Sequence, residues 1–204
     1  MNGNYPKLGA ILLLVSVAGA QAADPVTPEM VPAICGGCHG PDGVNDSPVI
    51  PNIAGQPADF LRYALLAYAS REWQSVIVET ILAHYSLSDV DVMVEFYAAR
   101  PYVGIKQEVD PRKVEVGKKI HYQLCDNCHM EGGRAPDEYE PILAGQWMPY
   151  MRHAIELNRT GQRPQVPMMA TKIAKLSDEG VEALVHYYGS HAFKRDPDGK
   201  ITVE

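Results

Sequence analysis

A chain of 204 residues in which 46% are hydrophobic is long enough for one domain or two small ones, at roughly 100–200 residues per domain. It carries 18 Lys and Arg against 25 Asp and Glu, and this net charge of -7 argues against a nucleic acid or an anionic membrane as a partner held by bulk electrostatics. Only 3 Phe and 2 Trp accompany 16 Pro and 17 Gly, so we expect something other than side chains to fill part of the interior.

The first residues predict a secretory signal. Lys7 precedes an apolar run over residues 8–17, and Ala20 and Ala22 supply a small-residue cleavage site. This run is shorter than the roughly 20 residues that span a bilayer, and no later segment is long and apolar enough to do so. We therefore expect residues 1–22 to be a signal peptide and the mature protein to be periplasmic, without a membrane span.

Two five-residue motifs use every cysteine of the chain: Cys35-Gly-Gly-Cys38-His39 and Cys125-Asp-Asn-Cys128-His129. Both have the C-x-x-C-H pattern of covalent c-type heme attachment, in which two thiols form thioethers and the histidine binds the iron. A lone C-x-x-C pair also fits a redox disulfide or half a zinc site. Two copies in an exported chain predict two covalently bound hemes c.

An offset of 90 residues aligns more than the cysteines. The segment 51–56, Pro-Asn-Ile-Ala-Gly-Gln, falls on 141–146, Pro-Ile-Leu-Ala-Gly-Gln. Pro51 and Pro141 each follow their motif histidine by twelve residues, and in cytochromes c the carbonyl of such a proline typically accepts a hydrogen bond from the histidine Nδ1–H. The repeat predicts a duplicated heme module.

Helix signals recur in both halves. Ser86 with Asp89 forms a capping-box pattern, and Ser177 precedes Asp178 and Glu179, so each half is expected to end in a core-facing helix. An opening helix is expected over 117–124, where a glycine at 117 would allow it to cross the closing helix closely. Apolar alternation typical of strands is scarce.

These patterns predict an all-α protein of two tandem cytochrome c modules. The expected division is 1–22 signal peptide, 23–100 first module, 101–112 linker, 113–192 second module and 193–204 solvated polar tail. Modules of about 80 residues are small for a core of side chains alone, and a heme in each would supply the missing interior.

The second half resembles the cytochrome subunit of flavocytochrome c sulfide dehydrogenase, within the two-heme class I cytochromes c. The segments that carry this resemblance are 125–129, 131–133, 142–147 (Ile-Leu-Ala-Gly-Gln-Trp), 149–150, 163–164 and 169–172 (Met-Ala-Thr-Lys). The resemblance is strong over about 112–190 and looser in the first half. It implies an FAD-containing partner subunit that oxidises sulfide and passes electrons to the hemes, which deliver them to a small soluble cytochrome.

The resemblance also implies a methionine as sixth iron ligand, seven residues before the first apolar anchor of the closing helix. Counting back from Leu176 gives Met169 for the second heme, with its neighbour Met168 as the alternative. In the first half the same count from Tyr85 gives Val78, which has no donor atom.

The remaining donors of the first half fit the sixth position poorly. Met30 precedes the heme motif, Met93 lies inside the expected closing helix, and His84 aligns with Lys175, away from the expected ligand position. We keep His84 as a minority candidate, and we expect the two hemes to be inequivalent.

The other histidines, at 121, 153, 186 and 191, lack metal-ligand spacing and are expected to be structural or surface residues. Trp147 and Arg152 are placed either to touch heme propionates or to pack. No catalytic triad, phosphate loop or dinucleotide motif is visible, so the chain is expected to do no bond-making chemistry, and FAD would have to lie on another chain. Two alternatives remain: a free diheme carrier to a terminal oxidase, or a heme enzyme with an open coordination site at the first heme.

Overall fold

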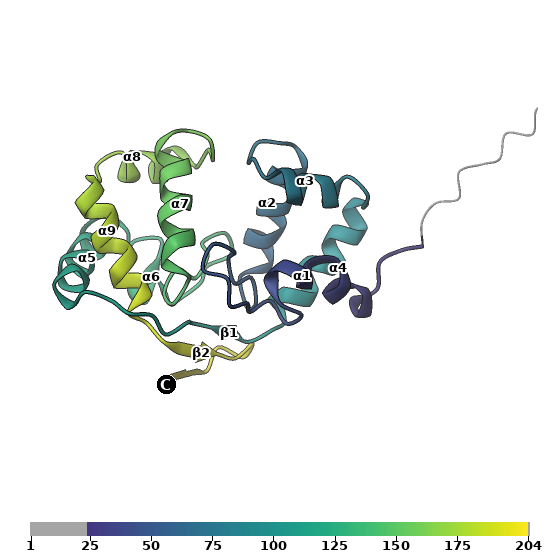
Figure 1. Cartoon of the computed structure of the whole chain (residues 1–204), viewed down its shortest axis with the longest axis horizontal. Coiled ribbons are helices and arrows are strands. Elements are labelled where there is room, and N and C mark those ends of the chain that lie inside the picture. Colours follow the sequence, from purple (N-terminus) through teal and green to yellow (C-terminus); the bar gives the residue numbers. More distant parts are fainter. Residues whose placement is uncertain (1–23, 204) are drawn as a thin grey trace, which may run out of the picture.

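The computed structural model describes residues 24–203, so the predicted signal peptide lies outside the described residues. Two helical lobes stand side by side, and a small sheet runs below both of them (Figure 1). The first lobe holds η1 (Pro28–Met30), α1 (Val31–His39), α2 (Ala58–Ala69), α3 (Val76–Leu82) and α4 (Leu87–Ala98). The second holds α5 (Pro111–Leu124), α6 (Met130–Gly133), α7 (Met148–Arg159), α8 (Pro167–Ile173) and α9 (Asp178–Gly189). The expected mostly helical architecture is confirmed.

The predicted helix caps form as local chemistry dictates. The Ser86 hydroxyl accepts the Asp89 N–H at 3.2 Å while the Asp89 carboxylate accepts the Ser86 N–H at 2.9 Å, a complete capping box for α4. The Ser177 hydroxyl accepts the Gly180 N–H at 3.1 Å and starts α9. These side chains satisfy amide groups that have no partner within the helix.

The opening helix of the second lobe is longer than the sequence predicted. It begins at Pro111 because the Asp110 carboxylate accepts the Arg112 N–H at 2.9 Å, and a proline in the first helical turn requires no hydrogen bond from its nitrogen. The last two residues of the expected linker, 101–112, therefore belong to α5.

Gly117 lies where α5 crosses α9, as predicted. A Cβ at this position would lie 2.0 Å from the Ala183 carbonyl oxygen, which is far inside van der Waals contact. Only glycine permits this approach of the two helices.

Each lobe has its own apolar core, and the two cores occupy equivalent positions. Met93 and Leu184, the seventh residues of α4 and α9, are each 2% exposed at the centre of their clusters. Val31 of α1 joins the first core and Val185 of α9 the second, both fully buried. Met93 is thus a core residue.

The expectation of a solvated tail over 193–204 was wrong. Its residues form the strands β2 (Phe193–Arg195) and β3 (Ile201–Val203), and β2 pairs antiparallel with β1 (Tyr102–Val103) in the expected linker. Phe193 is 3% exposed because it packs on Tyr102, whose hydroxyl donates to the Ala144 carbonyl at 2.7 Å. A third core of Tyr102, Ile142, Ala144 and Phe193 results.

Reciprocal hydrogen bonds join the lobes about a local twofold relation. The Gln146 amide accepts the Asn52 N–H at 3.0 Å and donates to the Asn52 carbonyl at 2.8 Å. The Gln56 amide does the same to Ile142, at 2.9 Å and 3.0 Å. Both glutamines and Asn52 and Ile142 are buried, and these are the positions that the 90-residue offset aligns.

A buried cation–π contact forms a second bridge between the lobes. The Arg163 guanidinium lies 3.7 Å from the centre of the Trp73 ring, and the Trp73 indole N–H donates to the Pro164 carbonyl at 3.2 Å. Arg163 also donates to the Tyr150 hydroxyl at 3.2 Å and is 8% exposed. The two lobes therefore share a desolvated interface. Within the described part of the chain, no helix has the length and apolarity needed to cross a bilayer.

Candidate functional site

The two C-x-x-C-H motifs lie at equivalent helix ends. In the first lobe Cys35, Cys38 and His39 occupy the end of α1. In the second, Cys125 caps α5, and the His129 N–H donates to the Cys125 carbonyl at 3.0 Å to extend the turn by one step. Each motif thus places its cysteines about one helical turn apart with the histidine adjoining, which is the arrangement that covalent heme attachment requires.

The loops that follow the histidines have the same internal hydrogen bonds. The Gly43 carbonyl accepts the amides of residues 53 and 54 at 2.9 and 3.1 Å, and the Gly133 carbonyl accepts those of 143 and 144 at 2.9 and 3.0 Å. Both glycines have positive φ, of 83° and 81°, and press against the equivalent tyrosines Tyr97 and Tyr188. The sequence repeat is therefore a repeat in three dimensions.

The first motif histidine is oriented as predicted. His39 Nδ1 and the Pro51 carbonyl oxygen are 2.9 Å apart, so the ring donates from Nδ1 and leaves the Nε2 lone pair free. Burial lowers the pKa of His39, which keeps the imidazole neutral, the form that binds iron.

The second motif histidine differs in one contact. His129 is 6% exposed and burial lowers its pKa to about 4, but its Nδ1 has no hydrogen-bond partner. The Pro141 carbonyl nevertheless lies close enough to raise the pKa of the ring against the effect of burial, so the predicted contact is present but looser than that of His39.

The cysteines fit heme attachment better than redox catalysis. All four are free thiols, and burial raises the pKa of Cys35 to about 11 and also raises that of Cys125. A redox-active C-x-x-C pair requires a lowered thiol pKa. Among residues 24–203, no group of three or more His, Cys, Asp and Glu side chains is arranged to hold a metal ion.

The residues considered for sixth ligands lie on two equivalent helices. Met169 is half-buried at the third position of α8, whereas Met168 beside it is 65% exposed. Val78 is half-buried at the third position of α3 and packs against the first core. Met169 is thus the less exposed of the two methionines, and Val78 has the equivalent place in α3.

His121 is more than a surface residue. It is fully buried, its Nδ1 lies 2.9 Å from the Tyr188 hydroxyl, and its Nε2 lies 3.1 Å from an Asp126 carboxylate oxygen. The first lobe has Val31 at the equivalent position, four residues before its first motif cysteine. The alignment of His121 with the apolar Val31 is therefore the feature of the sequence that indicates a buried histidine here.

The other candidate residues are structural. His186 Nδ1 accepts the Asp110 N–H at 3.1 Å, His191 Nδ1 donates to the Tyr187 carbonyl at 2.8 Å, and His153 is exposed. Trp147 donates its indole N–H to the Asn45 carbonyl across the lobe interface at 3.2 Å, and Arg152 pairs with Glu182.

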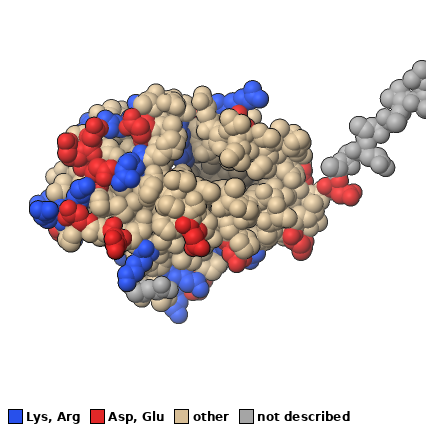
Figure 2. All heavy atoms as spheres, viewed as in Figure 1, with Lys and Arg blue, Asp and Glu red and all other residues tan. Residues whose placement is uncertain are grey.

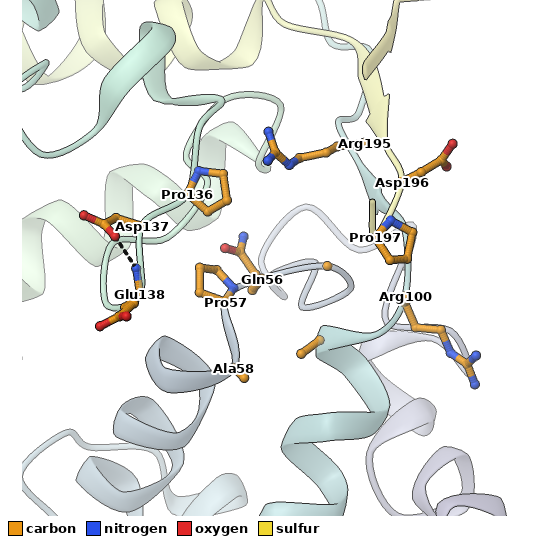
Figure 3. Close-up of a pocket in the computed structure, with 12 residues that line it drawn as sticks. Gln56, Pro57, Ala58, Arg100, Pro136, Asp137, Glu138, Arg195, Asp196 and Pro197 are labelled. Carbon is orange, nitrogen blue, oxygen red and sulfur yellow. Dashed lines mark hydrogen bonds between the residues drawn. The ribbon is translucent and has the colours of Figure 1, made fainter. Parts of the chain in front are cut away.

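A hollow of about 350 Å³ lies between the lobes, on the side of the C-terminal hairpin (Figure 3). Gln56, Pro57, Pro136 and Pro197 line it, and Arg100 and Asp196 point away from its centre. It is distinct from the heme motifs and contains no grouping of catalytic side chains. The space-filling view shows a hollow near the middle of the face drawn (Figure 2).

Comparisons with known proteins agree with this arrangement. Residues 112–187 match the family model described as cytochrome c oxidase, cbb3-type, subunit III. Cytochrome c4 of Azotobacter vinelandii is 28% identical over 88% of this chain and 96% of its own length. The thiosulfate dehydrogenase electron acceptor of Stutzerimonas stutzeri is 25% identical over 92% of this chain and 94% of its own.

A further relative matches in part, and solved structures match in fold. The cytochrome subunit of sulfide dehydrogenase of Chlorobaculum tepidum is 30% identical, but over only 39% of this chain and 74% of its own length. The crystal structure of reduced cytochrome c4 from Pseudomonas stutzeri superposes with a TM-score of 0.72 at 25% identity, over 80% of this chain and 96% of that one. With its two equivalent motifs and lobes, the chain is similar over most of its length to the diheme cytochromes c4, and it carries the attachment motifs for two covalently bound hemes.

Proposed function

We propose that this protein is a periplasmic carrier that takes electrons from a dehydrogenase into one heme and releases them from the other to a small soluble cytochrome. The pseudo-twofold interface is the observation that carries this proposal. Buried reciprocal hydrogen bonds hold the loops that follow the two heme motifs against each other. They would keep the two hemes at a fixed separation, which supports electron transfer from one lobe to the other.

The residues of the chain have defined roles in this proposal. Cys35 and Cys38 hold one heme, and Cys125 and Cys128 hold the other. His39 and His129 bind the two irons, and Met169 supplies a thioether to the second. The hemes supply reversible one-electron chemistry, while the protein orients each histidine and excludes water around it. Neutral imidazoles, kept so by burial, support the ligand roles of both histidines.

The electron donor is proposed from the relatives. Similarity over nearly the whole chain to a thiosulfate dehydrogenase electron acceptor and to cytochromes c4 supports a freely diffusing carrier. Similarity over 39% of the chain to a sulfide dehydrogenase subunit supports a stable complex with an FAD-containing subunit. Both forms receive electrons from an enzyme that oxidises a reduced sulfur compound, and we propose this class of donor.

Purification of the native protein separates the two forms. A stable complex predicts co-elution of this chain with a flavoprotein and reduction of the hemes by sulfide in the complex only. A free carrier predicts a monomer that a separate dehydrogenase reduces in the presence of its substrate. Fast reduction and turnover of sulfide or thiosulfate by the isolated chain would contradict the carrier role, because the dehydrogenase chemistry would then reside here.

A further inference from the structure

We propose that the first heme has no protein ligand on its α3 side and binds a neutral diatomic gas, such as nitric oxide or carbon monoxide, at that position. This inference goes beyond electron transfer and rests on the attachment of a heme at Cys35 and Cys38. It concerns the residue of α3 at the position equivalent to Met169 of α8.

The structural equivalence of α3 and α8 fixes the position. Both helices have seven residues, and both bury the last one, Leu82 at 5% and Ile173 at 4% exposed. Each is followed after the same interval by the serine that caps the closing helix. The third residue of α8 is Met169, and the third residue of α3 is Val78. A valine side chain has no atom that can bind iron.

Hydrogen bonds fix the register of α3. The Ser75 hydroxyl accepts the Val78 N–H at 3.4 Å, and the Glu79 carboxylate accepts the Ser75 N–H at 2.9 Å. A shift by one residue would break both bonds and remove Leu82 from the core. No neighbouring residue therefore takes the place of Val78 by a slip of the helix.

The other possible donors of the first lobe are occupied or remote. Residues 24–105 contain no lysine, two methionines and one histidine besides His39. Met93 is 2% exposed in the core between α1 and α4, and Met30 is 43% exposed at the start of α1. At about 1.5 Å per helical residue, Met30 lies roughly 13 Å along the axis from His39. His84 is exposed in the turn between α3 and α4.

The surroundings favour a neutral ligand. Val78 offers no hydrogen bond to a bound anion, and residues 24–105 carry 10 Asp and Glu against 3 Lys and Arg. This acidic lobe repels sulfide, azide and cyanide anions, whereas carbon monoxide and nitric oxide carry no charge. Polarity and hydrogen-bond donors on this side of a heme decide which ligands it accepts.

Titration of the reduced, full-length holoprotein with carbon monoxide tests the site. We expect one molecule bound per chain of two hemes, with a change in about half of the Soret absorption. In Val78→Met we expect this uptake to disappear and a second sulfur-to-iron band to appear in the far red of the oxidised spectrum. Met169→Val should raise the uptake to two per chain, and Met168→Val, the matched control, should leave it at one.

Several results would overturn the inference. Absence of uptake by the wild type, with both irons low-spin, would show that a protein group binds the first iron. Uptake that appears only in His84→Ala would identify that group as His84. Uptake that persists in a folded Val78→Met protein would refute the role of Val78. Because none of these readouts involves a donor enzyme, the outcome is independent of the proposed carrier function.

Discussion

At the scale of single residues, the third position of α8 holds the proposed sixth ligand of the second heme. Met169 is half-buried there, while Met168, one residue earlier, is 65% exposed. We expect Met169→Ala to abolish the far-red sulfur-to-iron band and to lower the potential of the second heme, because thioether ligation favours the reduced iron. Redox titration followed by absorbance measures both. Met168→Ala is the matched control, and a loss of the band in this variant would reverse the assignment.

The buried imidazole of His121 makes stability depend on pH. Burial lowers the pKa of His121 despite the nearby Asp126 carboxylate, so the unfolded chain, with a histidine pKa of about 6.5, binds the proton more tightly than the folded one. The folded state is therefore expected to lose stability as the pH falls below about 6.5.

The melting temperature of the holoprotein between pH 7.5 and pH 5 measures this loss. In His121→Val, which copies Val31 of the first lobe, the slope between these pH values should be shallower. An unchanged slope would assign the pH dependence to another group.

Chemistry at the residue scale was predictable where it is local in sequence. The C-x-x-C-H motifs follow from spacing along the chain. The His39–Pro51 bond and the Met169/Val78 contrast follow from that spacing together with the resemblance to known cytochromes c. The His121–Tyr188 contact was not predictable, because its partners are 67 residues apart and nothing in their local sequences couples them. The contact of His129 with the Pro141 carbonyl is looser than that of His39 with the Pro51 carbonyl, so equal spacing alone does not guarantee equal geometry.

At the scale of elements, the crossing of α5 and α9 is the tightest contact of the second lobe. A Cβ at Gly117 would meet the Ala183 carbonyl at 2.0 Å, whereas a Cβ at Gly180 meets nothing closer than 3.6 Å. We expect Gly117→Ala to lower the free energy of unfolding by about 2–3 kcal/mol, the upper range for overpacking in a core. Chemical denaturation checks this. Gly180→Ala, on the same helix pair, should be neutral or slightly stabilising, and equal losses in both variants would show that the crossing is not rigid.

The helices were predictable because their signals are local, and the sheet was not. Serine caps, first-turn carboxylates and apolar stripes lie within a few residues of one another. In contrast, β1 and β2 each have two or three residues and pair across more than 90 positions. The charged residues of 194–199 favoured the prediction of an exposed tail. The burial of Phe193 could not be predicted, because Tyr102 and Ile142, which pack against it, come from distant parts of the chain.

At the scale of the whole molecule, the glutamine bridges couple the two lobes. Truncation of Gln146 leaves the buried N–H and carbonyl of Asn52 without partners. Each unsatisfied group lowers the free energy of unfolding by about 1–3 kcal/mol. We expect Gln146→Ala to split one cooperative thermal transition into two. Gln56→Ala should act alike, because the bonds are symmetric. Calorimetry checks this against Gln162→Ala, an exposed control, and a single unshifted transition would mean that the lobes are coupled elsewhere.

The two halves of the molecule differ sharply in charge, and this asymmetry is expected to direct association. Residues 24–105 carry 3 Lys and Arg against 10 Asp and Glu, whereas residues 106–204 carry 14 against 15. On the face drawn in Figure 2, basic side chains lie mixed with acidic ones over the second lobe and near the hairpin below it. A soluble cytochrome with a basic surface should therefore dock on the first lobe, and complementary charge raises the association rate more than the affinity.

Stopped-flow electron transfer to a basic cytochrome tests this orientation. At low salt, the double variant Asp46→Asn with Glu72→Gln should slow association several-fold, because both carboxylates are exposed on the first lobe. Glu108→Gln with Glu138→Gln removes the same charge from exposed positions of the second half and should change the rate little. The difference should vanish as salt shortens the screening length below about 10 Å. Equal slowing by both double variants would show that net charge alone, and not its placement on the first lobe, governs the encounter.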